Sequence, residues 1–239
     1  MRIALYNGEG TRSSCVRMLY MHFSEMECEV TLVDPASIAG VLQEKPTALV
    51  FPGGRDVPYH EGLQGDLNRK IRDYVQGGGH FIGICAGGYY GTSYTEFDRG
   101  GPLEVASSRE LRFFPGRAVG PAFPFPRFCY DSEQGARPAR LQVGRESMFA
   151  YFNGGCYFEN AEEYPGVRVI ARYAELANRP AAIVQCRCGE GKAALFGVHP
   201  EFPLTVLPEG SGMRTEDIVR KRFFMNYLQR FVRDEQCDF

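Results

Sequence analysis

The chain lacks any long apolar run. No segment approaches the roughly 20 consecutive apolar residues that a membrane-spanning helix needs, and the segment from Met1 to Gly8 lacks the apolar stretch of a signal peptide. We therefore expect a cytoplasmic protein that does not bind a membrane. Its 239 residues are enough for one large α/β domain, so we predict a single domain over residues 1–239.

An excess of charge of either sign is also absent. The net charge is −2, which gives no general attraction to nucleic acid. Only four of the 27 basic residues are lysines. A GC-rich genome is the main explanation for this preference, and arginine clusters that hold carboxylates or phosphates are the alternative. We expect a small-molecule substrate or ligand and no nucleic-acid partner. The sequence leaves open whether the chain forms a homodimer.

Metal ligands are few and scattered. The four histidines form no cluster, and Cys186-Arg187-Cys188 has the wrong spacing for a C-x-x-C redox or zinc motif. We therefore expect no metal and no cofactor. Reduced thiols are also expected, because the chain is not a small secreted domain. The sequence has eight cysteines, at positions 15, 28, 85, 129, 156, 186, 188 and 237.

Short β-rich runs alternate with helical patterns in the first part of the chain. Such alternation predicts an α/β fold with a mainly parallel central sheet and helices on both faces, a flavodoxin-like three-layer sandwich. Thr11 or Ser13 could cap the first helix. The expected strands are 2–7, 28–33, 48–51, 81–84, 167–172, 181–186 and 193–198, and the expected helices are 11–23, 65–75 and 215–232.

Two segments depart from the simple alternation of strands and helices. Residues 96–165 are rich in proline, glycine, arginine and aromatic residues, and we interpret them as an irregular insertion. Within it, three prolines in 116–127 argue against an interior strand and favour an ordered loop or lid. In 215–232, a broad apolar stripe that begins at Ile218 and Val219 is expected to pack on the core.

The sequence Gly83-Ile84-Cys85-Ala86-Gly87 follows an expected strand. A sharp strand-to-helix turn around a nucleophile requires small residues two positions before and two positions after it, because the backbone approaches closely there. Gly83 and Gly87 meet this requirement. Cys85 is therefore predicted to be an exposed nucleophile, at a helix N-terminus whose N–H groups favour an anion.

A cysteine nucleophile also needs oxyanion donors, a base and a group that orients the base. The flexible Pro52-Gly53-Gly54 turn follows a neighbouring strand, so the N–H groups of Gly54 and Ala86 are the predicted oxyanion hole. His199 and Glu201 lie two residues apart beyond a strand end. Parallel sheets bring such strand ends together at one edge, so Cys85, His199 and Glu201 are the predicted catalytic residues.

These motifs resemble those of the class I glutamine amidotransferase superfamily. That resemblance implies a Cys-His-Glu triad that hydrolyses an amide through a thioester. More narrowly, 51–56, 83–91 and 151–155 are similar to the amidotransferase-like N-terminal domain of biotin–protein ligases. We find no glycine-arginine-rich biotinyl-adenylate loop, so biotin ligation is not expected. The segments also supply predicted substrate-lining residues: Gly53, Arg55, Gly87, Tyr89, Asn153, Gly154 and Gly155.

The sequence leaves several alternatives open. Asn153-Gly154-Gly155 is equally well explained as a hairpin turn between aromatic strands. The main hypothesis is a cysteine hydrolase or amidase that acts on a small amide or acyl compound. The alternative is a ligand-binding or regulatory module that keeps the pocket without turnover. A third is a redox sensor, since an exposed thiolate can be oxidised to sulfenic acid.

Overall fold

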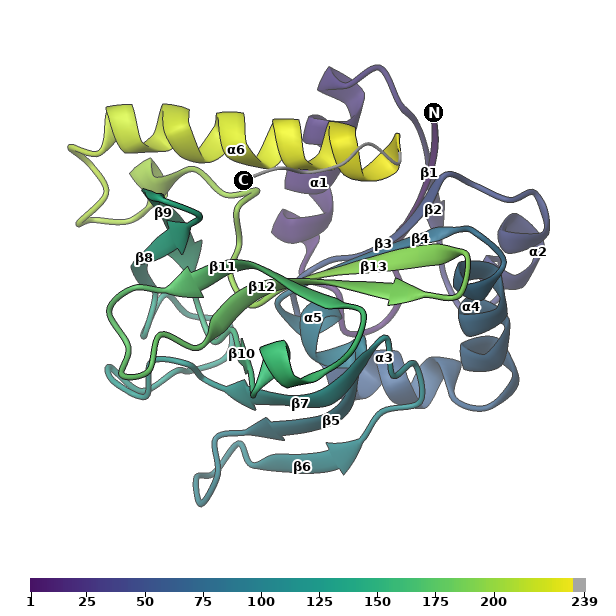
Figure 1. Ribbon diagram of the computed structural model, residues 1–239, viewed down its shortest axis with the longest axis horizontal. Coiled ribbons are helices and arrows are strands. Elements are labelled where there is room, and N and C mark those ends of the chain that lie inside the picture. Colours follow the sequence, from purple (N-terminus) through teal and green to yellow (C-terminus); the bar gives the residue numbers. More distant parts are fainter. Residues whose placement is uncertain (234–239) are drawn as a thin grey trace.

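Apolar runs at the start of the chain form the buried parallel strands at the centre of the fold. The computed structural model describes residues 1–233, which contain one sheet of 13 strands (Figure 1). Its first five neighbours are all parallel, in the order β2-β1-β3-β4-β13. They are β1 (Arg2–Tyr6), β2 (Glu29–Val33), β3 (Ala48–Phe51), β4 (His80–Ile84) and β13 (Gly191–Phe196).

Beyond β13 the sheet continues with mostly antiparallel neighbours. The order is β13-β12-β10-β7-β5-β6, and a branch from β12 carries β11, β8 and β9. The last three form a curled extension at one end of the sheet (Figure 1). The bounds are β5 (Thr92–Phe97), β6 (Val105–Ser108), β7 (Phe114–Gly120), β8 (Arg137–Val143), β9 (Glu146–Phe152), β10 (Tyr157–Phe158), β11 (Val167–Tyr173) and β12 (Ala181–Cys188).

Helices cover both faces of the parallel strands. One face carries α1 (Ser13–Glu25) and α6 (Arg214–Val232), which lie beside each other above the sheet in Figure 1. The other face carries α2 (Ile38–Gln43), α3 (Asp56–Leu63), α4 (Asp66–Gln76) and the short α5 (Ala86–Tyr90). The predicted three-layer α/β fold is therefore confirmed.

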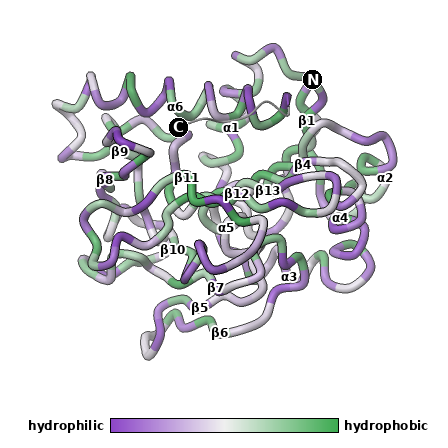
Figure 2. Tube along the Cα trace, viewed as in Figure 1, coloured by the Kyte–Doolittle hydropathy of each residue, from purple (hydrophilic) through white to green (hydrophobic). Residues whose placement is uncertain are grey.

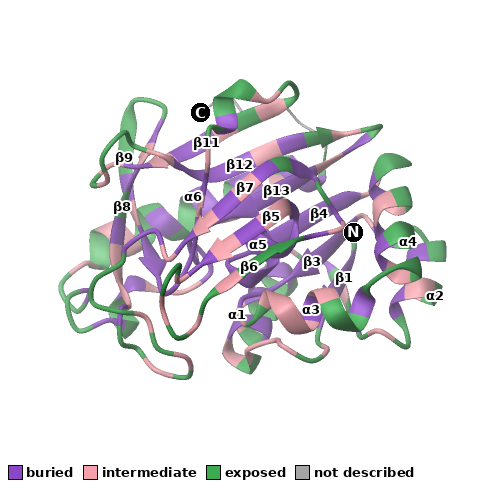
Figure 3. Ribbon diagram, turned by 90° about the horizontal axis from the view of Figure 1, so that it is seen from below, coloured by how far each residue is buried: buried purple, intermediate pink, exposed green. Residues whose placement is uncertain are grey.

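Successive strand residues point into different layers, as the pleat requires. In β1, Leu5 packs in the core beneath α1 and α6, whereas Ala4 and Tyr6 pack in the core on the side of α3 and α4. The buried parallel strands at the centre of the sheet are accordingly mostly apolar (Figure 2). Burial is concentrated in the sheet, and the exposed residues lie on outer helices and loops (Figure 3). Two apolar cores, one on each face of the sheet, thus hold the parallel strands in place.

Several sequence-based expectations are wrong. The segment 96–165 is not irregular, because most of β5 and all of β6 to β10 lie in it. In 116–127, residues up to Gly120 belong to β7, which pairs on both sides; the three prolines follow the strand and so remove no ladder donor. The N-cap of α1 is Arg12, not Thr11 or Ser13.

The apolar stripe of α6 is only partly buried. Most of it packs on the core, but Ile218 is 61% exposed and Val219 is 36% exposed. Among residues 1–233 no helix has both the length and the apolar character to cross a bilayer. The seven cysteines in this part of the chain are free thiols, and Cys237 lies outside the described residues.

Candidate active site

Cys85 occupies a strained turn between β4 and α5. Its φ of 50° and ψ of −102° lie in a region that residues with a side chain seldom adopt, at a cost of about 1–3 kcal/mol. The turn depends on its two glycines. A Cβ at Gly83 would lie 2.2 Å from the carbonyl oxygen of Gly87, and a Cβ at Gly87 would lie 2.2 Å from that of Phe51. The predicted strand-to-helix elbow is confirmed.

The expectation that Cys85 is exposed is wrong. Only 6% of the residue is exposed, and its thiol lies in the wall of a cavity of about 510 Å³ at the carboxyl end of the parallel strands. The thiol donates a hydrogen bond to the carbonyl oxygen of Asn153, which lies 3.8 Å from the sulfur. A ligand therefore reaches Cys85 through this cavity.

Gly54 and Ala86 both line the cavity beside Cys85. Ala86 is the first residue of α5, where a backbone N–H has no acceptor within the helix. Gly54 has a φ of 148°, and a Cβ there would lie 2.0 Å from the carbonyl oxygen of Gly10. Only glycine fits this position. The fold thus holds the backbone of both residues in place, and their role as oxyanion donors stays a prediction.

His199 and Glu201 follow β13 in a tightly held turn. The His199 Nδ1 lies 2.8 Å from Oε1 of Glu201, and both side chains are buried. The backbone N–H of His199 donates to the carbonyl oxygen of Tyr151. The carbonyl oxygen of Pro200 accepts from Arg220, and that of Glu201 lies 2.9 Å from Nε2 of His22. Sequence reasoning missed His22 and Arg220, because α1 and α6 bring them to the turn from distant parts of the chain.

His199 is electrostatically coupled to Cys85. Burial lowers the pKa of His199, but the negative charges of Cys85 and Glu201 and hydrogen bonds to two thiols raise it well above its usual value. An imidazole with a raised pKa can remain protonated beside a thiolate. Cys85 and His199 thus line the same cavity, and Glu201 lies behind His199, buried and bonded to it.

A second thiol, Cys15 on α1, touches the same histidine, and no sequence motif pointed to it. Burial is the main cause that raises the pKa of Cys15, and a hydrogen bond with His199 opposes it. Donor atoms of Cys15, His199 and Glu201 all lie within 4.8 Å of one another, so the three could hold a metal ion. Because Nδ1 of His199 is already bonded to Glu201, they are better described as a hydrogen-bonded cluster.

The predicted substrate-lining residues divide into two groups. Arg55, Tyr89, Asn153 and Gly154 line the cavity. The Tyr89 hydroxyl, however, donates to the carbonyl of Gly154 at 3.1 Å, so it links two segments of the cavity wall.

The other three predicted lining residues, all glycines, do not line the cavity. Gly53 makes room for His199, since a Cβ there would lie 2.5 Å from Cε1 of the imidazole. Gly87 packs on Phe51, and Gly155 packs on Gly197. The segment 153–155 is not a hairpin turn, because β9 and β10 pair with other strands.

Comparison with curated proteins gives two relatives. An uncharacterised protein of Chlamydia muridarum is 45% identical over 183 residues, covering 75% of this chain and 68% of the relative. A biotin–protein ligase of Schizosaccharomyces pombe is 39% identical over 213 residues, covering 84% of this chain. This match spans only about a third of the ligase, 33% of its length.

Solved structures share the fold at low sequence identity. A chain of PurLQS from Thermotoga maritima superposes with a TM-score of 0.58 at 18% identity, covering 95% of this chain and 98% of that one. A glutamine amidotransferase from the same organism gives 0.57 at 12% identity, covering 97% and 98%. The fold is therefore that of class I glutamine amidotransferases.

The model of one protein family spans nearly all the described residues. It is the family described as biotin–protein ligase, N terminal, and it matches residues 1–230. Together with the relatives above, this match shows that the chain belongs to the biotin–protein ligase N-terminal family.

Proposed function

We propose that the protein is a cysteine-dependent hydrolase or amidase that acts on a small amide or acyl compound through Cys85, His199 and Glu201. The observation that carries this proposal is the strained backbone of Cys85 beside a His199–Glu201 hydrogen bond of 2.8 Å. Strain at one buried cysteine stabilises nothing in the fold. It is typical of sites where a side chain must be held in one orientation for chemistry.

The reaction follows from the positions of these groups. The Cys85 sulfur attacks the carbonyl carbon, and the electron pair of the C=O bond moves to oxygen, where the N–H groups of Gly54 and Ala86 stabilise it. His199 gives its proton to the leaving group as the C–N or C–O bond breaks, which leaves a thioester. Water, deprotonated by His199, then hydrolyses the thioester and regenerates the thiol.

Glu201 orients the imidazole and stabilises its charge. Its Oε1 holds Nδ1 of His199, which leaves Nε2 for Cys85 and the leaving group. Cys15 also contacts this ring and takes no part in the proposed reaction. Biotin transfer, the activity named for the yeast relative, is not part of this proposal.

The test is the rate at which iodoacetamide alkylates each cysteine, followed by peptide mass spectrometry at neutral pH. Cys85 of the wild type should react faster than the exposed Cys129, although it is buried, and His199→Ala should abolish this advantage. Equal rates for wild type and His199→Ala, with both proteins folded, would refute a coupled pair.

The aromatic lining of the cavity favours a second candidate, a ligand-binding or regulatory module without turnover. Rings of Tyr89, Phe128 and Tyr130 line it, and such walls hold ligands well. This candidate predicts a ligand whose affinity survives Cys85→Ala and whose bound form remains chemically unchanged. The hydrolase predicts product release that Cys85→Ala abolishes.

A further inference from the structure

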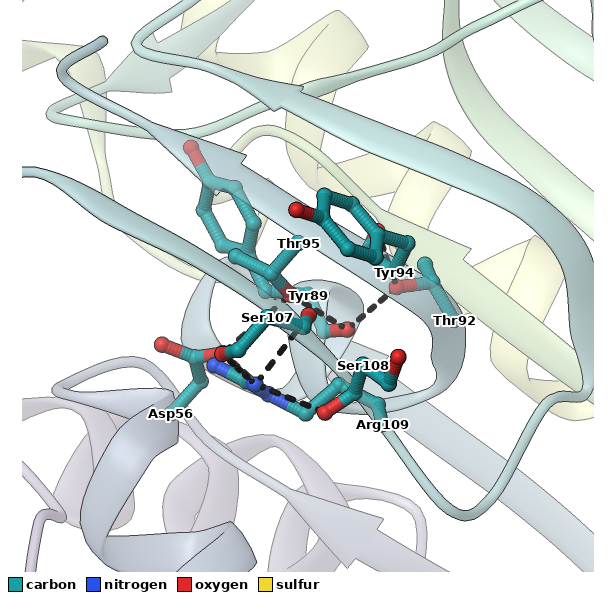
Figure 4. Close-up of polar contacts among 8 residues, drawn as sticks. All are labelled: Asp56, Tyr89, Thr92, Tyr94, Thr95, Ser107, Ser108 and Arg109. Carbon is teal, nitrogen blue, oxygen red and sulfur yellow. Dashed lines mark hydrogen bonds and ion pairs between the residues drawn. The ribbon is translucent and has the colours of Figure 1, made fainter.

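Asp56, at the start of α3, is held by a buried arginine in an unusual way. The Arg109 side chain is 1% exposed, and its Nε and Nη2 both donate to Oδ2 of Asp56, at 2.8 and 2.6 Å. The Thr95 hydroxyl donates to the same oxygen at 3.3 Å. Figure 4 shows these donors together on one side of the carboxylate, with the other oxygen directed away from Arg109.

An arginine–carboxylate pair commonly uses both carboxylate oxygens. Here Thr95 in β5 and Arg109, which directly follows β6, both donate to Oδ2 only. The Ser107 hydroxyl fixes the guanidinium by accepting from its Nη1. Asp56 lines the cavity of Cys85, and none of the described residues donates to its Oδ1. The arrangement therefore presents a rigid acceptor to whatever enters the cavity.

Asn153 supplies a second acceptor in the same cavity. The residue is 7% exposed, and its Nδ2 donates to the carbonyl of Ser132 at 3.1 Å, which fixes the orientation of the amide. Its Oδ1 is buried and has no hydrogen-bond partner among the described residues. A buried acceptor without a donor is costly, at about 1–3 kcal/mol, so a ligand that donates there is favoured.

The remaining charges of the cavity wall favour a cation. Besides Asp56, three carboxylates line it against two arginines. Arg12 lies 3.6 Å from Glu133, and the Arg55 guanidinium stacks on the Tyr130 ring at 5.4 Å, so both arginines are already engaged. Aromatic faces in the wall add cation–π attraction for an ammonium group.

We propose that the cavity binds the ammonium group of a cationic amide or acyl substrate, with Oδ1 of Asp56 and Oδ1 of Asn153 as its hydrogen-bond acceptors. This inference rests on the proposed function for the reacting end of the substrate, and adds the chemical class of its other end. An ammonium group offers up to three N–H donors, which is enough for two acceptors.

The test uses three methanethiosulfonate reagents of similar size, with ethylammonium, hydroxyethyl and ethylsulfonate groups. Each forms a mixed disulfide with a thiolate and releases methanesulfinate. Rates at Cys85 are read by peptide mass spectrometry and divided by the rate of each reagent with free 2-mercaptoethanol. Wild type should favour the cationic over the anionic reagent by about tenfold or more, the factor that corresponds to about 1.4 kcal/mol.

The variant Asp56→Asn/Arg109→Gln removes two opposite charges and keeps the net charge of the protein. It should lose most of the preference, and Asn153→Ser should reduce it severalfold. The matched control is Asp131→Asn, which removes another carboxylate of the cavity wall and should keep most of the preference. If the double variant fails to fold, Asn153→Ser against Asp131→Asn decides the question.

Two results would overturn the inference: no preference for the cation in the wild type, or a preference that survives in both the folded double variant and Asn153→Ser. The hydroxyethyl reagent separates this from the proposed function. Its rate at Cys85 should depend on His199 whatever the charge of the pocket. A His199-dependent rate without cation preference leaves the hydrolase and refutes only the ammonium site.

Discussion

Replacing Gly53 by alanine would place a methyl carbon 2.5 Å from Cε1 of His199 and 2.9 Å from Sγ of Cys15. Carbon atoms in contact prefer about 3.5 Å, so the imidazole must move by about 1 Å. The ring cannot simply swing outward, because it is buried and held by Glu201. A misplacement of about 1 Å in a catalytic constellation lowers rates by about 10²-fold.

The assay is the alkylation rate of Cys85 in Gly53→Ala, with circular dichroism melting to verify the fold. The matched control is Gly40→Ala, where an added methyl group meets nothing within 4 Å. We expect Gly53→Ala to lose most of the His199-dependent rate and Gly40→Ala to retain it. A folded Gly53→Ala protein with the wild-type rate would refute the conclusion that His199 must lie where it does.

Three further predictions concern the residues that support the site. Gly54→Ala should destabilise the fold by more than about 3 kcal/mol in urea unfolding, from the strained φ and the clash with a backbone oxygen, whereas Gly212→Ala should have little effect because nothing lies within 4 Å of its added methyl; equal effects would contradict this. Burial lowers the pKa of His22. Below about pH 6.5, His22 is therefore protonated in the unfolded chain while it is still neutral in the folded chain. The stability that wild type has over His22→Gln should therefore be largest above that pH and shrink as the pH falls, and a difference that grows towards acid pH would be inconsistent. Tyr89→Phe should lower the unfolding free energy by about 1 kcal/mol and leave Cys85 alkylation unchanged; a large loss of alkylation would instead give this hydroxyl a direct part in the chemistry.

The sequence predicted the parts of the molecule that local patterns determine. The apolar runs before Gly53 and Cys85 became adjacent parallel strands, and their ends meet because parallel strands share a carboxyl edge. The small residues around Cys85 predicted its strained turn. Each of these features depends on residues that are neighbours in the chain or on a general rule of sheet geometry.

What the sequence could not predict depends on contacts between distant segments. Cys15 reaches His199 because the first turn of α1 begins beside the Gly53-Gly54 turn, and Arg109 reaches Asp56 through the pairing of β5 with β6. In 96–165 the local hairpin of β8 and β9 was overlooked. The strands β7 and β10 were missed because they pair with distant segments and prolines adjoin β7. Tertiary contacts overrode the local signal there.

The most direct test of the central claim is whether Cys85 forms an acyl-enzyme that His199 helps to hydrolyse. Wild type and His199→Ala are incubated with p-nitrophenyl acetate, and acetylated peptides are identified by mass spectrometry. We predict turnover beyond one equivalent for wild type, with a transient acetyl group on Cys85, and no sustained turnover for the variant. Acetylation confined to exposed residues such as Cys129, with none at Cys85, would contradict the account.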